Sequence, residues 1–290
     1  MQASQIANGR RQHLLGQNLS ATNLGDDAFI PTSFQSLEEA RNWLDHIHTC
    51  AMQGMQSLPP PTPIADPPSP MVKLSLELIR NSSTIRLKQW SSAFESLLRA
   101  QRDDPSELEQ RKIHILKLHR VLTGLNLSID LARTKGDEMM WDDYTKEFET
   151  MVGYAEDLLK STKPQEQPAF MLETEVILPL YFVAVKCRHG RVRRKAISLL
   201  RSQYRQEGIW NSFLAATVAE HSMQIEEKGL NSTVVAAADI LRCKRVLGVE
   251  VGFDLEQGRA NLSYVKIREN GGIDRLDKCI RWTCSGPSET

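Results

Sequence analysis

The residues best suited to bind a charged partner lie in one basic segment, between Val176 and Gln206. This segment contains no acidic residue, and its eight cations are Lys186, Arg188, Arg191, Arg193, Arg194, Lys195, Arg201 and Arg205. Helical spacing places Arg191, Arg194 and Lys195 on one side of a helix. Such a patch can bind an acidic partner or phosphate, or act as a nuclear-import signal. The alternative, which we favour, is a solvated helix face whose cations pair with carboxylates elsewhere in the chain.

The histidines and cysteines do not have the spacing of a metal site. His46 and Cys50 would share one face of a helix, but His48 would point about 200° away, so three ligands cannot converge. Cys279 and Cys284 lack a second pair of ligands at zinc-site spacing. We therefore predict no metal-binding residues.

Catalytic and nucleotide-binding motifs are also missing from the sequence. It contains no phosphate-binding loop, no nucleophile elbow and no paired-histidine zinc motif. The acidic pairs Asp142-Asp143 and Glu226-Glu227 fall where we expect solvated helix faces. The sequence thus predicts no catalytic residue and no cofactor, and we expect that the protein is not an enzyme.

The charge balance and the distribution of apolar residues limit the cellular setting. The 290 residues include 36 basic and 36 acidic side chains, so any affinity for nucleic acid must be local. The most apolar stretch, Val176 to Val185, is far shorter than the roughly 20 residues of a membrane-spanning helix. The N-terminus has no secretory apolar region, and five scattered cysteines fit a reducing compartment. We expect a protein of the nucleus or the cytoplasm, without membrane attachment.

Helical periodicity dominates the chain, and the predicted fold class is mainly α: an antiparallel helical array or bundle with a small C-terminal β-hairpin. The expected parts are a disordered leader (1–33), a helix (34–58), a proline-rich linker (59–70), a helical domain (71–244), and a β-hairpin with a tail (245–284).

Several local signals refine this prediction. Ser36 and Glu39 form a capping box at the first helix, and Asp104-Pro105 predicts the start of another. Pro179 should kink an apolar helix. Helices are expected over 138–160 and 233–244, and alternating apolar residues in 249–267 predict the hairpin.

One combination of residues resembles a known family. Pro179 opens an apolar helix, Lys186-Cys187-Arg188 forms a turn, an arginine-rich helix follows from Arg191, and Glu207-Gly208 to Trp210 closes the segment. This order is similar to the C-terminal half of fungal six-cysteine (binuclear) zinc-cluster transcription factors. Segments 34–47 and 249–267 also resemble that family, so the resemblance spans about 34–268.

The chain departs from the family in one important respect. Its first cysteine is Cys50 and it has no Cys-x-x-Cys pair, so no residues match the zinc-binding, DNA-reading module. The resemblance therefore implies a helical regulatory domain that acts in transcription through protein contacts, with transcriptional machinery or related factors as partners. It implies that this chain does not bind DNA sequence-specifically and that it is located in the nucleus. It also implies that the sequence is either a shortened paralogue or an incomplete gene model. The alternative is a helical-repeat scaffold or adaptor unrelated to transcription, in the cytoplasm.

Overall fold

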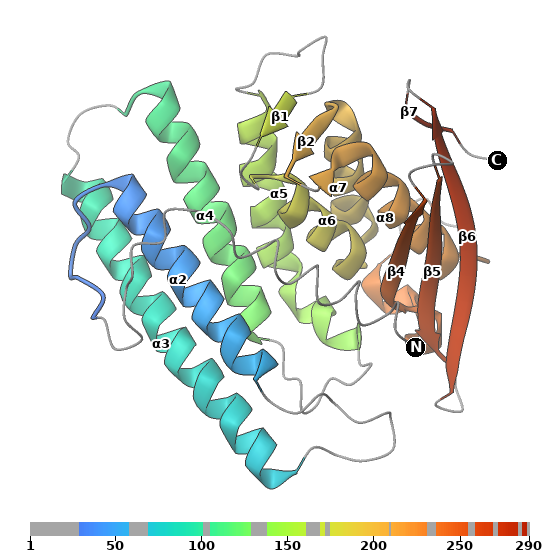
Figure 1. The fold of residues 1–290 in the computed structure, drawn as a ribbon, viewed down its shortest axis with the longest axis horizontal. Helices are drawn as coiled ribbons and strands as arrows, with labels where there is room; N and C mark the ends of the chain where they lie inside the picture. Colours follow the sequence, from blue (N-terminus) through green and yellow to red (C-terminus); the bar gives the residue numbers. More distant parts are fainter. Residues whose placement is uncertain are drawn as a thin grey trace. The chain divides into compact units, whose positions relative to one another are not determined.

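The computed structural model has the predicted mainly α fold with a β element at the C-terminus (Figure 1). It describes residues 29–57, 69–100, 105–128, 138–160, 169–171, 175–208, 210–230, 236–254, 259–268, 272–283 and 286–288. The chain forms two compact units, Met1–Gln110 and Arg111–Thr290. Their boundary falls within the segment 71–244 that was expected to form one helical domain. Most of the predicted leader and linker lies outside the described residues.

The first unit is built on two antiparallel helices, α2 (Leu37–Gln56) and α3 (Pro70–Ala100). The predicted cap is present at α2: the Ser36 hydroxyl accepts a hydrogen bond from the Glu39 amide at 3.1 Å. The Glu39 carboxylate accepts in turn from the Gln35 amide at 2.6 Å, one residue before the expected donor. These bonds satisfy backbone donors that the helix itself leaves unpaired.

A tryptophan fixes the packing of α2 against α3. The Trp90 indole donates to the Ala40 carbonyl at 2.6 Å and stacks on Phe94 with ring centroids 4.8 Å apart. Near the other end, a Cβ at Gly54 would lie 3.3 Å from the Ile79 side chain, so glycine permits the close approach of the helices. The apolar face predicted for the first helix is therefore buried against α3.

The second unit contains most of the helices. They are α4 (Glu107–Ser128, which begins before the boundary), the 3₁₀ helix η1 (Glu138–Tyr144), α5 (Thr145–Lys160), α6 (Ile177–Lys186), α7 (Gly190–Ser202) and α8 (Ser212–Glu226). All the helices from α4 through α8 contribute to one hydrophobic core. Its fully buried residues include Leu118, Phe148, Val183 and Ala196. The predicted helix over 138–160 is thus a 3₁₀ turn followed by an α-helix.

Two local predictions were wrong about how helices begin. α4 is capped by Ser106, whose hydroxyl accepts from the Glu109 amide at 3.3 Å, and Pro105 precedes the cap. Asp104 lies outside the described residues. Pro179 does not kink α6, because it lies in the first turn of the helix, where a backbone N–H has no partner inside the helix.

The second unit also contains a short three-stranded sheet, formed by chain segments that follow α5 and α7. Strand β1 (Ala169–Met171) pairs in parallel with β2 (Arg205–Glu207), which pairs with β3 (Trp210–Asn211). Gly208, between the last two strands, has a φ of 55°, a conformation that glycine adopts at little cost. The sequence analysis did not predict this sheet.

The C-terminal sheet has four antiparallel strands in the order β4 (Val246–Asp254), β5 (Arg259–Ile267), β6 (Ile273–Thr283) and β7 (Gly286–Ser288). The predicted hairpin is confirmed as β4 and β5, with Val249 opposite Tyr264. Residues 255–258, between these two strands, lie outside the described residues. The predicted tail is wrong, since β6 pairs along the whole of β5.

The helix expected over 233–244 is not present in the described part of that segment. Two 3₁₀ turns, η2 (Ala237–Asp239) and η3 (Arg242–Lys244), occupy residues 236–244. Carbonyl groups that a helix would use internally accept instead from the Arg245 side chain. Among the described residues, no helix has the length and hydropathy needed to cross a bilayer.

Candidate functional site

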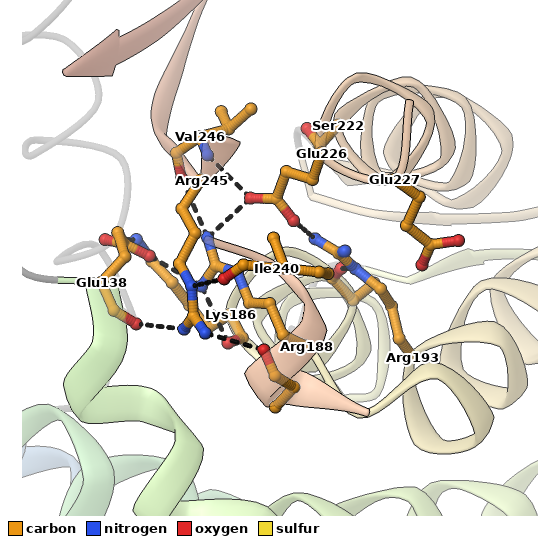
Figure 2. Close-up of polar contacts among 12 residues, drawn as sticks. Glu138, Lys186, Arg188, Arg193, Ser222, Glu226, Glu227, Ile240, Arg245 and Val246 are labelled. Carbon is orange, nitrogen blue, oxygen red and sulfur yellow. Dashed lines mark hydrogen bonds and ion pairs between the residues drawn. The ribbon is translucent and has the colours of Figure 1, made fainter. Parts of the chain in front are cut away.

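A group of buried and partly buried charged side chains lies where α6, α7, α8, η1 and the start of β4 meet (Figure 2). We call it the ionic cluster, and its members are Glu138, Asp142, Lys186, Arg188, Arg193, Glu226 and Arg245. A short link between α6 and α7 positions Arg188, because α6 ends at Lys186 and α7 begins at Gly190. The link thus places a guanidinium group inside the unit.

Glu226 is the centre of the ionic cluster. One carboxylate oxygen accepts from Nη2 of Arg188 at 2.8 Å and from the Val246 amide at 2.7 Å. The other oxygen forms an ion pair with Nη2 of Arg193 at 2.5 Å. All three side chains are completely buried. Glu226 therefore connects two arginines of the helical core to the first strand of the C-terminal sheet.

Glu138 binds the other side of Arg188. Its carboxylate accepts from Nη1 of Arg188 at 2.7 Å and from Nζ of Lys186 at 2.7 Å. Arg188 also donates to the Val246 carbonyl, and Lys186 donates to the Leu247 carbonyl, both at 3.1 Å. Both cations thus reach η1 and β4 at once.

Arg245 holds the segment before β4 in place. It makes two parallel bonds to Asp142, at 2.7 and 2.8 Å. It also donates to the carbonyls of Glu138, Ala237 and Ile240, at 2.9, 2.9 and 3.0 Å. A planar guanidinium with five donors suits this geometry, and a lysine could not replace it.

Burial and the neighbouring opposite charges shift the pKa values of the cluster in opposite directions. Burial favours the uncharged form of Glu226, but Arg193 and Arg188 outweigh it and lower the pKa of this carboxyl. Burial lowers the pKa of Arg193 despite Glu226, whereas Glu226 and Glu138 raise the pKa of Arg188 against the same effect. Glu226 is therefore ionised at neutral pH, and the arrangement suits the joining of structural elements better than proton transfer.

A second buried carboxylate caps the start of α6. Glu207 accepts from the backbone amides of Glu175, Val176 and Ile177, at 2.8, 3.1 and 3.0 Å. Nε of Arg205 lies 3.4 Å from Oε1 of Glu207, and its Nη2 lies 3.0 Å from Oε2 of Glu175. The Glu175 carboxylate also binds Arg111. Burial raises the pKa of Glu207, although the backbone donors oppose this shift.

The eight cations of the predicted basic patch do not form one surface. Lys186, Arg188, Arg193 and Arg205 point into the second unit and bind the carboxylates described above. The outer four pair with glutamates of other elements: Arg191 with Glu149, Arg194 with Glu227, Lys195 with Glu156 and Arg201 with Glu220. The hypothesis of a continuous exposed patch is thus corrected. The four inward cations come from the end of α6, the link, α7 and β2, and each is turned toward a carboxylate of the second unit.

Sequence reasoning placed two members of the ionic cluster wrongly. Glu226 and Asp142 were expected on solvated helix faces. Glu226 is fully buried, and the Asp142 side chain, which binds Arg245, is only 23% exposed. For Glu226 a signal was present, because Ala215, Ala219 and Ser222 precede it at helical spacing and are also buried.

The histidines and cysteines considered for a metal site lie on α2 and, for Cys279, on β6. Cys50 Sγ lies 3.6 Å from Nε2 of His46 on α2. Within the described part of the chain, no three histidine, cysteine or acidic side chains form a group that could hold a metal ion. Cys284 lies outside that part.

No family model matches the chain, and searches of curated proteins and of solved structures give no significant match.

Proposed function

We propose that the chain is a regulatory protein of the type found in the C-terminal half of fungal six-cysteine zinc-cluster transcription factors. It acts on transcription through protein contacts in the nucleus, with no zinc cluster of its own and no catalytic step. Its partners are transcriptional machinery or related factors. The alternative is a helical scaffold or adaptor that has no link to transcription.

The observation that carries the proposal is the structural role of the resembling residues. Cys187 is buried in the link between α6 and α7, Arg188 and Arg193 bind Glu226, and Glu207 caps α6. A buried network of paired charges constrains residue identity, because a member that loses its partner is costly. The resemblance therefore rests on positions that determine a fold rather than on generic amphipathic helices.

The surface of α7 supports protein contacts over phosphate binding. Each of its four outer cations has a carboxylate partner, which reduces the positive potential available to a nucleic acid. We expect the purified chain to bind duplex DNA weakly and without sequence preference at about 150 mM salt. Fluorescence anisotropy with unrelated duplexes measures this, and a site-selective complex at that salt concentration would contradict it.

The proposal is tested by tethering the full chain to a heterologous DNA-binding domain upstream of a reporter gene. We expect a change in reporter expression and a tagged, untethered chain in the nuclear fraction. The matched variants are Arg193→Met, which disrupts the ionic cluster, and Glu149→Gln, which changes an exposed pair. Arg193→Met should weaken the reporter effect, because it destabilises the second unit, and Glu149→Gln should retain it.

Other outcomes distinguish the alternative. A strictly cytosolic chain that leaves the reporter unchanged, while it captures cytosolic proteins, would support the scaffold. A reporter effect that survives Arg193→Met with the fold lost would mean that the effect does not come from the folded unit, and this result would also contradict the proposal.

A further inference from the structure

The first half of α3 is apolar, but it contributes no buried residue to the first unit. Six of the ten residues from Met71 to Arg80 are apolar, and none of the ten is buried. All the buried residues of α3 lie from Ser83 onward. Figure 1 shows the first turns of α3 running past the end of α2, which leaves these turns without that helix as a cover. An apolar segment that the fold leaves in solvent is typical of a contact surface.

The most exposed apolar side chains of α3 form one stripe. Met71, Leu74, Leu78 and Ile85 follow one another at steps of three, four and seven residues, so they share one side of the helix. They are between 53% and 72% exposed, and the exposed Asn81 lies between the last two. We call the four apolar residues the α3 stripe, and it is about 21 Å long. This spacing is the one at which a second helix packs alongside the first.

The charges of this part of α3 indicate the sign of a partner. Residues 70–89 contain one acidic side chain and four basic ones, which are Glu77 and Lys73, Arg80, Arg86 and Lys88. Within the described part of the chain, Lys73, Arg80 and Lys88 have no ion-pair partner. Every outer cation of α7, in contrast, pairs with a glutamate. The positive potential of α3 is therefore not cancelled at short range as that of α7 is.

A second copy of the chain does not satisfy these charges. Two α3 helices packed stripe to stripe would bring two net positive segments together, and like charges oppose such docking. A helix that carries carboxylates beside its apolar residues would instead cover the α3 stripe and pair with Lys73 and Lys88. The charges thus favour an acidic amphipathic helix over self-association.

We propose that the α3 stripe binds an amphipathic helix of a partner protein, with apolar residues at steps of three and four and acidic residues beside them. The apolar residues pack on Met71, Leu74, Leu78 and Ile85, and a polar side chain opposite Asn81 sets the register. The inference rests on the proposed function for the role of this partner in transcription, and it adds the surface and the chemistry of the contact.

Fluorescence anisotropy of the full chain with a labelled synthetic peptide tests the surface. The peptide has about 18 residues, long enough for a helix, with leucines at steps of three and four and glutamates beside them. Its twin has lysines in place of the glutamates. The acidic peptide should bind at least about tenfold more tightly than the twin at about 150 mM salt, because like charges oppose docking of the twin. Equal affinities, or no binding of the acidic peptide, would overturn the proposal.

Two matched leucine variants locate the binding. Leu78→Ser replaces an exposed residue, so the core stays intact, and it should weaken binding of the acidic peptide about tenfold because a leucine is no longer buried on docking. Leu241→Ser alters a leucine of the second unit that is also 60% exposed, and it should leave the affinity unchanged. Equal affinities of the two variants would show that the α3 stripe is not the docking surface.

A charge-reversed variant and the oligomeric state complete the test. Lys73→Glu combined with Lys88→Glu should reverse the preference, so that this variant binds the lysine twin more tightly. Analytical ultracentrifugation of the purified chain should show a monomer. A dimer that Leu78→Ser disrupts would assign the α3 stripe to a second copy and overturn the acidic partner.

The peptide assay and the reporter assay fail independently. A chain that binds the acidic peptide through the α3 stripe but leaves the reporter unchanged would contradict the proposed function and support the surface. A chain that changes the reporter without binding the peptide would overturn the surface alone.

Discussion

Two arginines on α7, only two positions apart, lie in opposite environments. The Arg193 side chain is 0% exposed and pairs with Glu226 at 2.5 Å, whereas Arg191 is 77% exposed and pairs with Glu149 at 2.7 Å. The two distances are nearly equal, so distance does not distinguish the pairs. What differs is the solvent, because water screens the outer pair and can replace either partner, while nothing replaces a partner in the interior.

The comparison shows why the inner pair constrains the chain and the outer pair does not. Taking an ion pair out of water costs free energy that the attraction between the charges only partly returns, so a buried pair is weak evidence for net stability. Removal of one member is a different matter, since the other is left charged without water or partner. The bonds from Glu226 to Arg188 and to the Val246 amide add to this constraint.

The most disruptive single change in this comparison is Glu226→Ala. It leaves Arg188 and Arg193 buried without their shared carboxylate and the Val246 amide without its acceptor. We expect a loss of about 3–5 kcal/mol in the free energy of unfolding of the second unit. Native-state hydrogen exchange of α8 in increasing urea measures it, with Glu149→Ala as the exposed control. Equal small losses in both variants would show that burial does not separate the two pairs.

Arg193→Met should have a smaller effect in the same assay. The thioether fills much of the space, and Glu226 keeps Arg188 and the Val246 amide as partners. We expect a loss of about 1.5–3 kcal/mol, the usual worth of a hydrogen bond to a charged group. A loss as large as that of Glu226→Ala would assign the central role to Arg193 instead.

Much of the fold follows from periodicity. The helical faces of α2 and α7 and the alternation in β4 and β5 identify buried positions because apolar residues repeat at the spacing of the element. The cap at Ser36 was also recognisable, since it is a local hydrogen-bond pattern. The strand β6 was missed because charged residues occupy both of its faces, as in Asp274 and Arg275.

The ionic cluster was only partly predictable. Arg193 is followed by Ala196, Ile197 and Leu200 at three, four and seven residues, which marks it as inward-facing. The bond between Arg245 and Asp142 has no such signal, because 103 residues separate them and only the folded chain brings them together. Spacing reveals which side of a helix a charge occupies, but it does not reveal which charge it meets.

Acid should weaken the inner pair in a defined direction. The lowered pKa of Glu226 means that its ionised form is favoured by folding, so this contribution is complete above the unfolded value of about 4.5 and is lost as the pH falls through the folded value. The stability difference between wild type and Glu226→Gln should be constant from about pH 5 to 7 and shrink at lower pH, by about 1.4 kcal/mol per unit of pKa shift. Urea titrations over this range measure it, and a difference that grows on acidification would mean that Glu226 is protonated in the folded chain.

The smallest effect belongs to the outer pair. Arg191→Met, Glu149→Gln and the double variant form a cycle around one exposed contact. We expect a coupling of at most about 0.5 kcal/mol, because high dielectric weakens the attraction and ordering two long side chains costs entropy. The coupling should fall further when salt is raised from about 50 mM to about 500 mM, since the screening length then drops well below that in dilute buffer. A coupling above about 1 kcal/mol that resists salt would contradict the comparison, because it would place Arg191 in a shielded environment like that of Arg193.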